Sequence, residues 1–144
     1  MSNEMKDWLR EAQEDARWWL NRYPFLRIKC NDCCPWIKEN SDEFTFLDDL
    51  PVGWINSFCK PMCDELMEAL GDYADEWIIV QVKEKYGSLR IYHSGLPEDI
   101  YNKVEAVISK YEKISYHTCC VCGEPATEYS TGWILPYCSK HIKK

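Results

Sequence analysis

The C-terminal segment, residues 119–144, carries the pattern that most limits how this chain can fold. Cys119 and Cys122 form a C-x-x-C pair, and fifteen residues further on Cys138 and His141 form a C-x-x-H pair. A two-residue gap lets both ligands of a pair reach one tetrahedral ion, and Gly123 permits the tight backbone turn after the second thiolate. The spacing predicts a structural zinc site of the treble-clef or ribbon kind.

Four protein ligands would fill the coordination sphere of that zinc ion. Such a site leaves no open position for water or substrate, so it stabilises a fold rather than performing a reaction. The free energy of binding then becomes free energy of folding, which explains how so short a segment can hold a shape. Only one residue separates Cys120 from Cys122, so we interpret Cys120 as a buried thiol outside the site.

Nine cysteines in 144 residues also raise the question of disulfides. The N-terminal segment "MSNEMKDWLREAQEDARWW" is acidic and amphipathic, unlike a secretory signal, and no apolar run is long enough to span a bilayer. We therefore expect a soluble cytoplasmic protein with reduced thiols and no membrane partner. A second zinc site is the less favoured alternative, because its downstream pair has a looser spacing around Pro61; its ligands would be Cys30, Cys33, Cys59 and Cys63.

The hydrophobic pattern predicts an α+β fold. Apolar residues recur at helical spacing over residues 3–23, and again from the acidic pair before Pro51 to Gly71, with a break or kink at Pro61. Between these two helices we expect an irregular segment, with a short strand at residues 43–47.

A β-hairpin is the firmest structural expectation for the second half of the chain. Residues 77–83 and 89–93 read as two strands joined by a turn that contains Gly87. Pro97 and the two acids after it open a further amphipathic helix that extends to Ile114 and covers one face of the hairpin. We expect residues 1–118 to form this body of helices and hairpin, and residues 119–144 to form a zinc-binding ribbon packed on it.

The charge distribution limits the classes of partner. The net charge of −7 argues against broad attraction to a phosphate backbone. The stretch "VKEKYGSLR" is an exception, and its candidate ligand-binding residues, which could hold a phosphate or a carboxylate, are Lys83, Lys85, Tyr86 and Arg90. The simpler and favoured interpretation is a solvated hairpin tip with an internal ion pair to Glu84.

Catalytic signatures are missing from the sequence. There is no Gly-rich phosphate loop and no nucleophile elbow, and neither His93 nor His117 lies in a local acid/base pattern. We therefore expect a protein that is not an enzyme.

Four stretches together, "FTFLDDLPVGW", "VKEKYGSLRIY", "CVCGEPAT" and "GWILPYC", resemble a family of small uncharacterised proteins from phage genomes and prophages. The resemblance runs from about Tyr23 to His141. It implies a zinc-containing protein of viral or mobile-element origin that acts in a bacterial host cytoplasm, and it implies no reaction. The cysteines at which this chain departs from the family pattern are Cys30, Cys33, Cys34 and Cys59.

Three hypotheses for function follow. The leading one is a non-enzymatic interaction module that binds a host protein or a component of host defence. The second is a nucleic-acid-binding ribbon, since the sequence places Lys140, Lys143 and Lys144 near Trp133 and Tyr137. The third is binding of a small anionic ligand, such as a nucleotide, by the "KEKYGSLR" turn.

Overall fold

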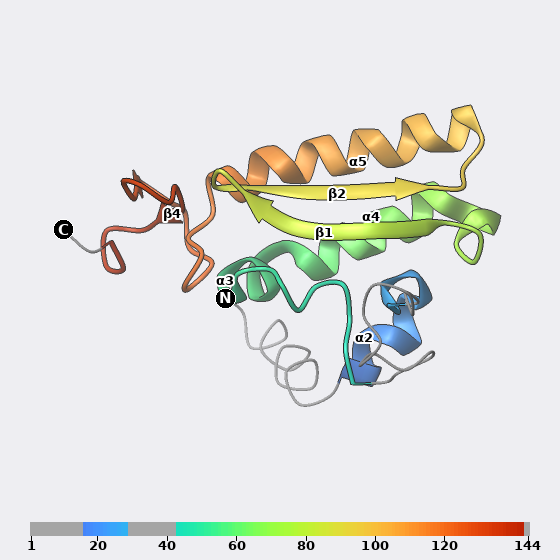
Figure 1. Cartoon of the computed structure of the whole chain (residues 1–144), viewed down its shortest axis with the longest axis horizontal. Helices are drawn as coiled ribbons and strands as arrows, with labels where there is room; N and C mark the ends of the chain where they lie inside the picture. The colour runs from blue at the N-terminus through green and yellow to red at the C-terminus, as the bar shows by residue number, and fades with distance from the viewer. Residues whose placement is uncertain (1–15, 29–42, 143–144) are drawn as a thin grey trace.

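The computed structural model describes residues 16–28 and 43–142, and it has the mixed α+β architecture that the sequence predicts (Figure 1). The described N-terminal part contains α2 (Ala16–Arg22) and the 3-10 turn η1 (Pro24–Leu26). A longer helical stretch follows, made of α3 (Val52–Trp54), the π-helical turn η2 (Ile55–Cys59), α4 (Lys60–Leu70) and the 3-10 turn η3 (Gly71–Tyr73). The remaining elements are β1 (Ile78–Lys85), β2 (Ser88–Ser94), α5 (Glu98–Tyr116), β3 (Glu128–Tyr129) and β4 (Pro136–Tyr137).

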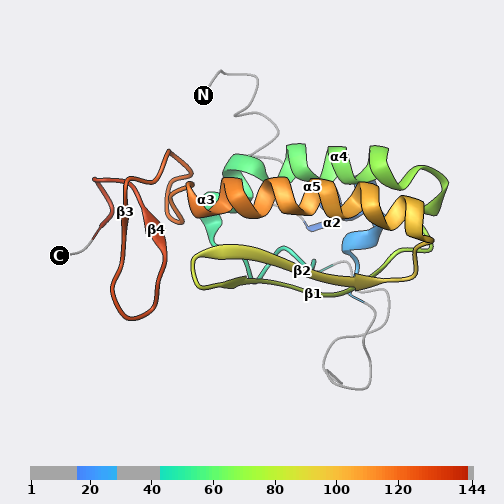
Figure 2. The same cartoon turned by 90° about the horizontal axis from the view of Figure 1, so that it is seen from above.

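Strands β1 and β2 form the expected antiparallel hairpin, and α4 and α5 cover one of its faces (Figure 2). Val82, Leu89 and Ile91 are buried on the covered face, and they alternate with residues that point away from the helices. The two-residue turn has positive φ at both Tyr86 (52°) and Gly87 (84°), which is the type I′ geometry that suits the twist of a hairpin. Turn geometry and burial therefore fix the same register.

The helical stretch from Val52 to Leu70 continues past Pro61, where the sequence predicts a break or kink. Pro61 lies in the first turn of α4, directly after the π-helical turn η2. A proline ring crowds the carbonyl one turn before it and has no N–H to donate, and a wider π turn relieves both problems. The helix thus changes its winding instead of ending. Its C-terminus is the expected Gly71, which has a φ of 52° and donates its N–H to Met67 O.

The strand expected at residues 43–47 is wrong, because this segment forms a turn. Thr45 donates its backbone N–H and its hydroxyl to the Asp48 carboxylate, and Asp48 donates its N–H back to Thr45 O. The hydrogen-bonding groups of Thr45 and Asp48 thus pair with each other within the turn. The segment can therefore form without a partner strand. Of the first expected helix, residues 16–22 are α2, and the part before residue 16 lies outside the described residues.

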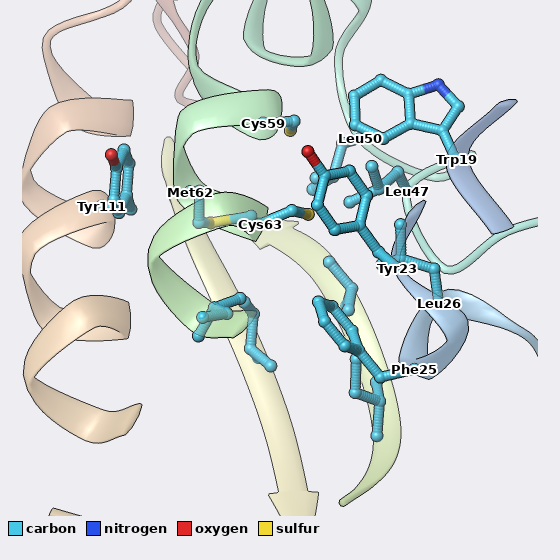
Figure 3. Packing of buried hydrophobic residues seen from close by; sticks show 14 of the residues in the cluster. Trp19, Tyr23, Phe25, Leu26, Leu47, Leu50, Cys59, Met62, Cys63 and Tyr111 are labelled. Atoms are coloured by element: carbon cyan, nitrogen blue, oxygen red, sulfur yellow. The ribbon is translucent and has the colours of Figure 1, made fainter. Parts of the chain in front are cut away.

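The hydrophobic core joins α2, η1 and α4 to the hairpin and α5. Figure 3 shows Cys59 of η2 and Met62 and Cys63 of α4 near aromatic and aliphatic side chains of α2 and of the segments that follow it. Tyr23 closes one side of this core by donating its hydroxyl to Asp64 at 2.5 Å. Of the described helices, none is both long and apolar enough to cross a membrane.

Candidate metal centre

The structure brings Cys119, Cys122, Cys138 and His141 together at one end of the molecule. The four potential ligand atoms all lie within 4.8 Å of one another. Strands β3 and β4 pair in antiparallel register, and this small hairpin carries the second pair of residues back to the first. Its turn contains Gly132, which has a φ of 79°. The residues predicted to bind one metal ion therefore form one cluster.

Two of three distances inside the cluster are within about 0.2 Å of those expected for a tetrahedral site, and the third is about 0.5 Å shorter. Bonds of about 2.3 Å to sulfur and 2.1 Å to nitrogen place two sulfurs about 3.8 Å apart and a sulfur and a nitrogen about 3.6 Å apart. Cys122 Sγ lies 3.7 Å from Cys138 Sγ, and His141 Nδ1 lies 3.8 Å from Cys119 Sγ and 3.1 Å from Cys138 Sγ. The donor set can hold a metal ion without large movement.

Two tight backbone turns present these ligands. In the first, Cys119 O accepts the Gly123 N–H at 3.0 Å, and Gly123 has a φ of 81° that residues with a side chain rarely adopt. In the second, Cys138 O accepts the N–H of His141 at 3.1 Å. Each turn places its second ligand three residues after its first, so both ligands face the same centre.

Two thiols of the cluster, Cys119 and Cys122, have pKa values shifted in opposite directions. Burial raises the pKa of Cys119, but N–H groups of Cys122, Cys138 and Val121 donate to its sulfur and lower the pKa to about 6. Burial raises the pKa of Cys122 to about 11, and the neighbouring thiols Cys138 and Cys119 add to that rise. A thiolate on Cys119 thus opposes ionisation of Cys122, and a bound cation would favour the thiolate form of both side chains.

The ribbon (residues 119–142) is joined to the start of the long helical stretch by close backbone packing. Gly53 donates its N–H to Cys120 O at 2.9 Å, and a Cβ at Gly53 would overlap Cys119 O and lie 2.7 Å from Cys120 C. Trp54 is fully buried and donates its indole N–H to Thr118 O at 2.9 Å. The metal cluster is thereby fixed against α3.

A second contact joins the ribbon to the tip of the β1–β2 hairpin. Glu84 accepts the Gly87 N–H at 2.9 Å and the indole N–H of Trp133 at 3.0 Å. Gly87 also lies against Ile134, because a Cβ there would approach Ile134 O to 3.3 Å. Glu84 therefore does not form the ion pair with a neighbouring lysine that the sequence suggested; it links the hairpin to the ribbon.

The other three cysteines that the structure describes lie outside the cluster. Cys120 is the buried thiol that the sequence predicts, and burial raises its pKa. Cys59 and Cys63 are fully buried in the core, where burial raises the pKa of both. Cys30 and Cys33 lie outside the described residues, so the second metal site stays a prediction. Within residues 16–28 and 43–142, the C-terminal cluster is the only group of three or more potential ligands close enough to share an ion.

The candidate ligand-binding residues of the "KEKYGSLR" stretch do not converge on one point. Lys83 lies directly opposite Arg90 across the hairpin, and Lys85 and Tyr86 lie at its tip. Arg90 approaches Glu112 of α5 at 3.8 Å, while Lys83 lies 5.7 Å from the ring of Tyr92. These side chains form a row rather than a pocket.

Sequence reasoning missed the residues that fix the ribbon to the body, namely Gly53, Trp54 and the acceptor role of Glu84. Gly53 and Trp54 are part of the "LPVGW" stretch, but nothing in the local sequence shows that this stretch contacts the cysteines.

Of the lysines predicted to contact nucleic acid, Lys140 is exposed near the second turn, and Lys143 and Lys144 lie outside the described residues.

Comparison of the chain with protein-family models, curated proteins and solved structures finds no match.

Proposed function

We propose that this protein is a small binding module without a catalytic centre, and that one zinc ion on Cys119, Cys122, Cys138 and His141 keeps its ribbon folded. The observation that carries the proposal is the convergence of these four ligand atoms within 4.8 Å. Thiolate ligands favour a soft or borderline ion, and three sulfurs with one imidazole in tetrahedral geometry are typical of structural zinc.

The closed donor set supports a structural role for the ion. All four positions of a tetrahedral zinc ion would be taken by protein, so no position is left for an activated water or a substrate. The ribbon has little core of its own, since it contains only two-residue strands. Metal binding would therefore supply much of its folding free energy.

The contact between ribbon and hairpin tip supports a binding role. Here Glu84 fixes Trp133 by its indole N–H, and the Trp133 side chain is nevertheless 74 % exposed. A fixed and exposed tryptophan is typical of an interaction surface. A host protein, the first partner class that the sequence suggests, and action in a bacterial cytoplasm stay predictions.

Metal analysis of purified variants tests the zinc proposal. Wild-type protein should contain one zinc per chain by elemental mass spectrometry. Cys122→Ser and Cys138→Ser should lose it, whereas Cys120→Ser, the matched control from the same turn, should keep it. A wild-type protein without zinc, or equal loss in Cys120→Ser and Cys122→Ser, would overturn the proposal.

Zinc content also tests whether the second candidate metal site, on the upstream cysteines, binds an ion. A second zinc that survives Cys122→Ser and disappears in Cys30→Ser would place an ion on the upstream cysteines. One zinc per chain in both the wild type and Cys30→Ser would restrict metal binding to the ribbon.

A further inference from the structure

We propose that single-stranded nucleic acid binds to a surface that runs from the open face of the β1–β2 hairpin to the ribbon. We call this the hairpin–ribbon surface, and its residues are Lys83, Lys85, Tyr86, Arg90, Tyr92 and Trp133. The inference rests on the proposed function, because it names the partner of that binding module. It uses residues outside the metal cluster.

The first observation concerns three cationic side chains of the hairpin, of which Arg90 has an ion pair with Glu112 at 3.8 Å and the two lysines have none within the described residues. Lys83 and Arg90 lie directly opposite each other, an arrangement of like charges that destabilises a sheet. The buried Nε of Arg90 has no hydrogen-bond partner in the described part of the chain. In a chain of net charge −7, such a row provides a local site for phosphate groups.

The second observation is the strained and exposed ring of Tyr86. Tyr86 has a φ of 52°, the only positive φ at a non-glycine residue in the described ranges. Its side chain is 70 % exposed, so burial does not offset the strain. The first position of a type I′ turn is better suited to asparagine or glycine. A tyrosine that is held at an unfavourable φ and makes no core contact indicates a role in binding.

Two further rings complete an aromatic row. Trp133 is held in place through its indole N–H by Glu84, which leaves its faces available. Tyr92 is 43 % exposed on the open face, with Lys83 Nζ 5.7 Å from its ring centroid. Aromatic rings beside lysines and arginines are the combination by which proteins stack bases and hold the phosphates of unpaired strands.

The length of this row favours a strand over a single nucleotide. Five residues lie between Tyr86 and Tyr92, and these six backbone steps correspond to at most about 20 Å along a β-strand. At about 3.4 Å per stacked nucleotide, that distance fits roughly six nucleotides, and one nucleotide cannot reach both ends. Bases inside a duplex are covered by their neighbours, so ring stacking selects single strands.

Fluorescence anisotropy with labelled 15-mers of deoxythymidine and of uridine tests the inference on zinc-loaded, full-length protein. Binding should weaken as salt rises, with a log–log slope of about −2 for three phosphate contacts on a single strand. Trp133→Ala and Tyr86→Asn should each lower affinity at least about five-fold, by removing a stacking partner. Lys83→Ala and Arg90→Ala should each make the salt slope less steep by about 0.7.

The matched controls come from the start of α5, which begins at the end of the body away from the ribbon (Figure 1). Lys103 and Tyr101 are exposed there, so Lys103→Ala and Tyr101→Ala remove one charge and one ring outside the proposed surface. Both should bind as the wild type does. Circular dichroism and zinc content should be unchanged in every variant, which separates a loss of binding from a loss of folding.

Several results would overturn the inference. Absence of oligonucleotide binding at low salt would do so, as would salt-independent binding or equal losses in the controls. Equal binding of a mononucleotide would reassign the cations to a small-ligand site. Capture of a bacterial protein that depends on Trp133, without oligonucleotide binding, would assign the surface to a protein. In all these cases, normal zinc content would still support the proposed function, in which zinc stabilises the ribbon. Absence of zinc from the purified protein would contradict the proposed function itself.

Discussion

At the scale of single residues, Gly53 and Gly123 are the positions where the ribbon and α3 approach most closely. A Cβ at Gly123 would lie 2.7 Å from Gly53 O, and a Cβ at Gly53 would lie 2.8 Å from Gly123 N. These neighbours are backbone atoms, which cannot move aside as a flexible side chain can. Both glycines are therefore required by space, and Gly123, with a φ of 81°, is required by backbone conformation as well.

Gly53→Ala should destabilise the protein by about 2 to 3 kcal/mol, because the new methyl group has to push the ribbon away from α3. The free energy of unfolding, measured by urea denaturation, checks this. Gly132→Ala is the matched control: Gly132 has a φ of 79° but no atom near its Cβ position, so only backbone strain of about 1 kcal/mol is expected. If Gly53→Ala lowers the free energy of unfolding no more than Gly132→Ala does, the result would contradict close packing of the ribbon against α3.

Tyr86→Asn should make the protein more stable by about 0.5 to 1 kcal/mol, since asparagine tolerates the positive φ that tyrosine occupies at a cost. Thermal unfolding at fixed zinc concentration measures the change. Tyr92→Asn is the control, because Tyr92 lies within β2, where asparagine is unfavourable. Equal destabilisation of both variants would show that the Tyr86 ring contributes to folding.

At the scale of elements, α4 and α5 are joined by polar contacts at the edge of the core. The Glu65 carboxylate on α4 accepts hydrogen bonds from Lys110, at 2.7 Å, and from the Tyr111 hydroxyl on α5. The hydrogen bonds from Lys110 and Tyr111 hold the pKa of Glu65 below its usual value. Glu65 therefore makes the packing of these two helices sensitive to acid.

The stability contributed by Glu65 should be lost as the pH falls. Its folded pKa is below its unfolded pKa of about 4.3, so the unfolded chain takes up a proton first and acid favours unfolding below that pH. Urea unfolding of the wild type and Glu65→Gln at pH 6 and pH 3.5 should show a smaller loss in the variant. Glu68→Gln on the exposed side of α4 is the control and should behave as the wild type does. An identical pH dependence of stability in the wild type and Glu65→Gln would show that protonation of Glu65 does not destabilise the protein in acid.

Elements with a strong local pattern were predictable from sequence. The hairpin and α5 follow from their periodicity and from Gly87, and the structure confirms them with shifts of one or two residues. The π turn before Pro61 could not be predicted from the sequence, because a helix can accommodate a proline by a kink, a break or a π turn with the same sequence pattern. The turn at Thr45 was missed because its alternating residues resemble a strand, whereas hydrogen bonds to Asp48 determine its conformation.

At the scale of the whole molecule, the hydrophobic core and the metal cluster lie in different parts of the structure. The core cluster extends from α2 to α5 and includes no ribbon residue. Cys119, Cys120 and Cys138 are buried, but the ribbon surrounds them with few apolar side chains. Apolar burial therefore stabilises the body, whereas the ribbon would depend on the metal ion proposed for its cluster.

Removal of the metal should unfold the ribbon and leave the body folded. A strong chelator at neutral pH should release zinc and expose the ribbon thiols to a thiol reagent, while the helical circular dichroism of α4 and α5 changes little. The fully buried thiols of Cys59 in η2 and Cys63 in α4 serve as the internal control and should stay unreactive. Loss of most helical signal together with the zinc would show that body and ribbon fold as one unit.

The metal ligands could be predicted from sequence, and the surface around them could not. Two-residue gaps within the two pairs identify Cys119, Cys122, Cys138 and His141, because local geometry alone limits which residues share an ion. The contact of Trp133 with Glu84 spans 49 residues and depends on how the hairpin meets the ribbon. No spacing rule covers such a distance, so the junction is visible only in three dimensions.

The hydrogen bond from Trp54 to Thr118 has a consequence for the timing of folding. The two residues are 64 positions apart, and Gly53 depends on the same late segment through Cys120 O. During synthesis α3 therefore emerges well before its partners exist, and its indole and amide N–H groups must stay hydrated until the ribbon has been made. Burial of Trp54 therefore becomes a late step in a newly made chain, because this part of the body is complete only once residues 118–120 have been synthesised.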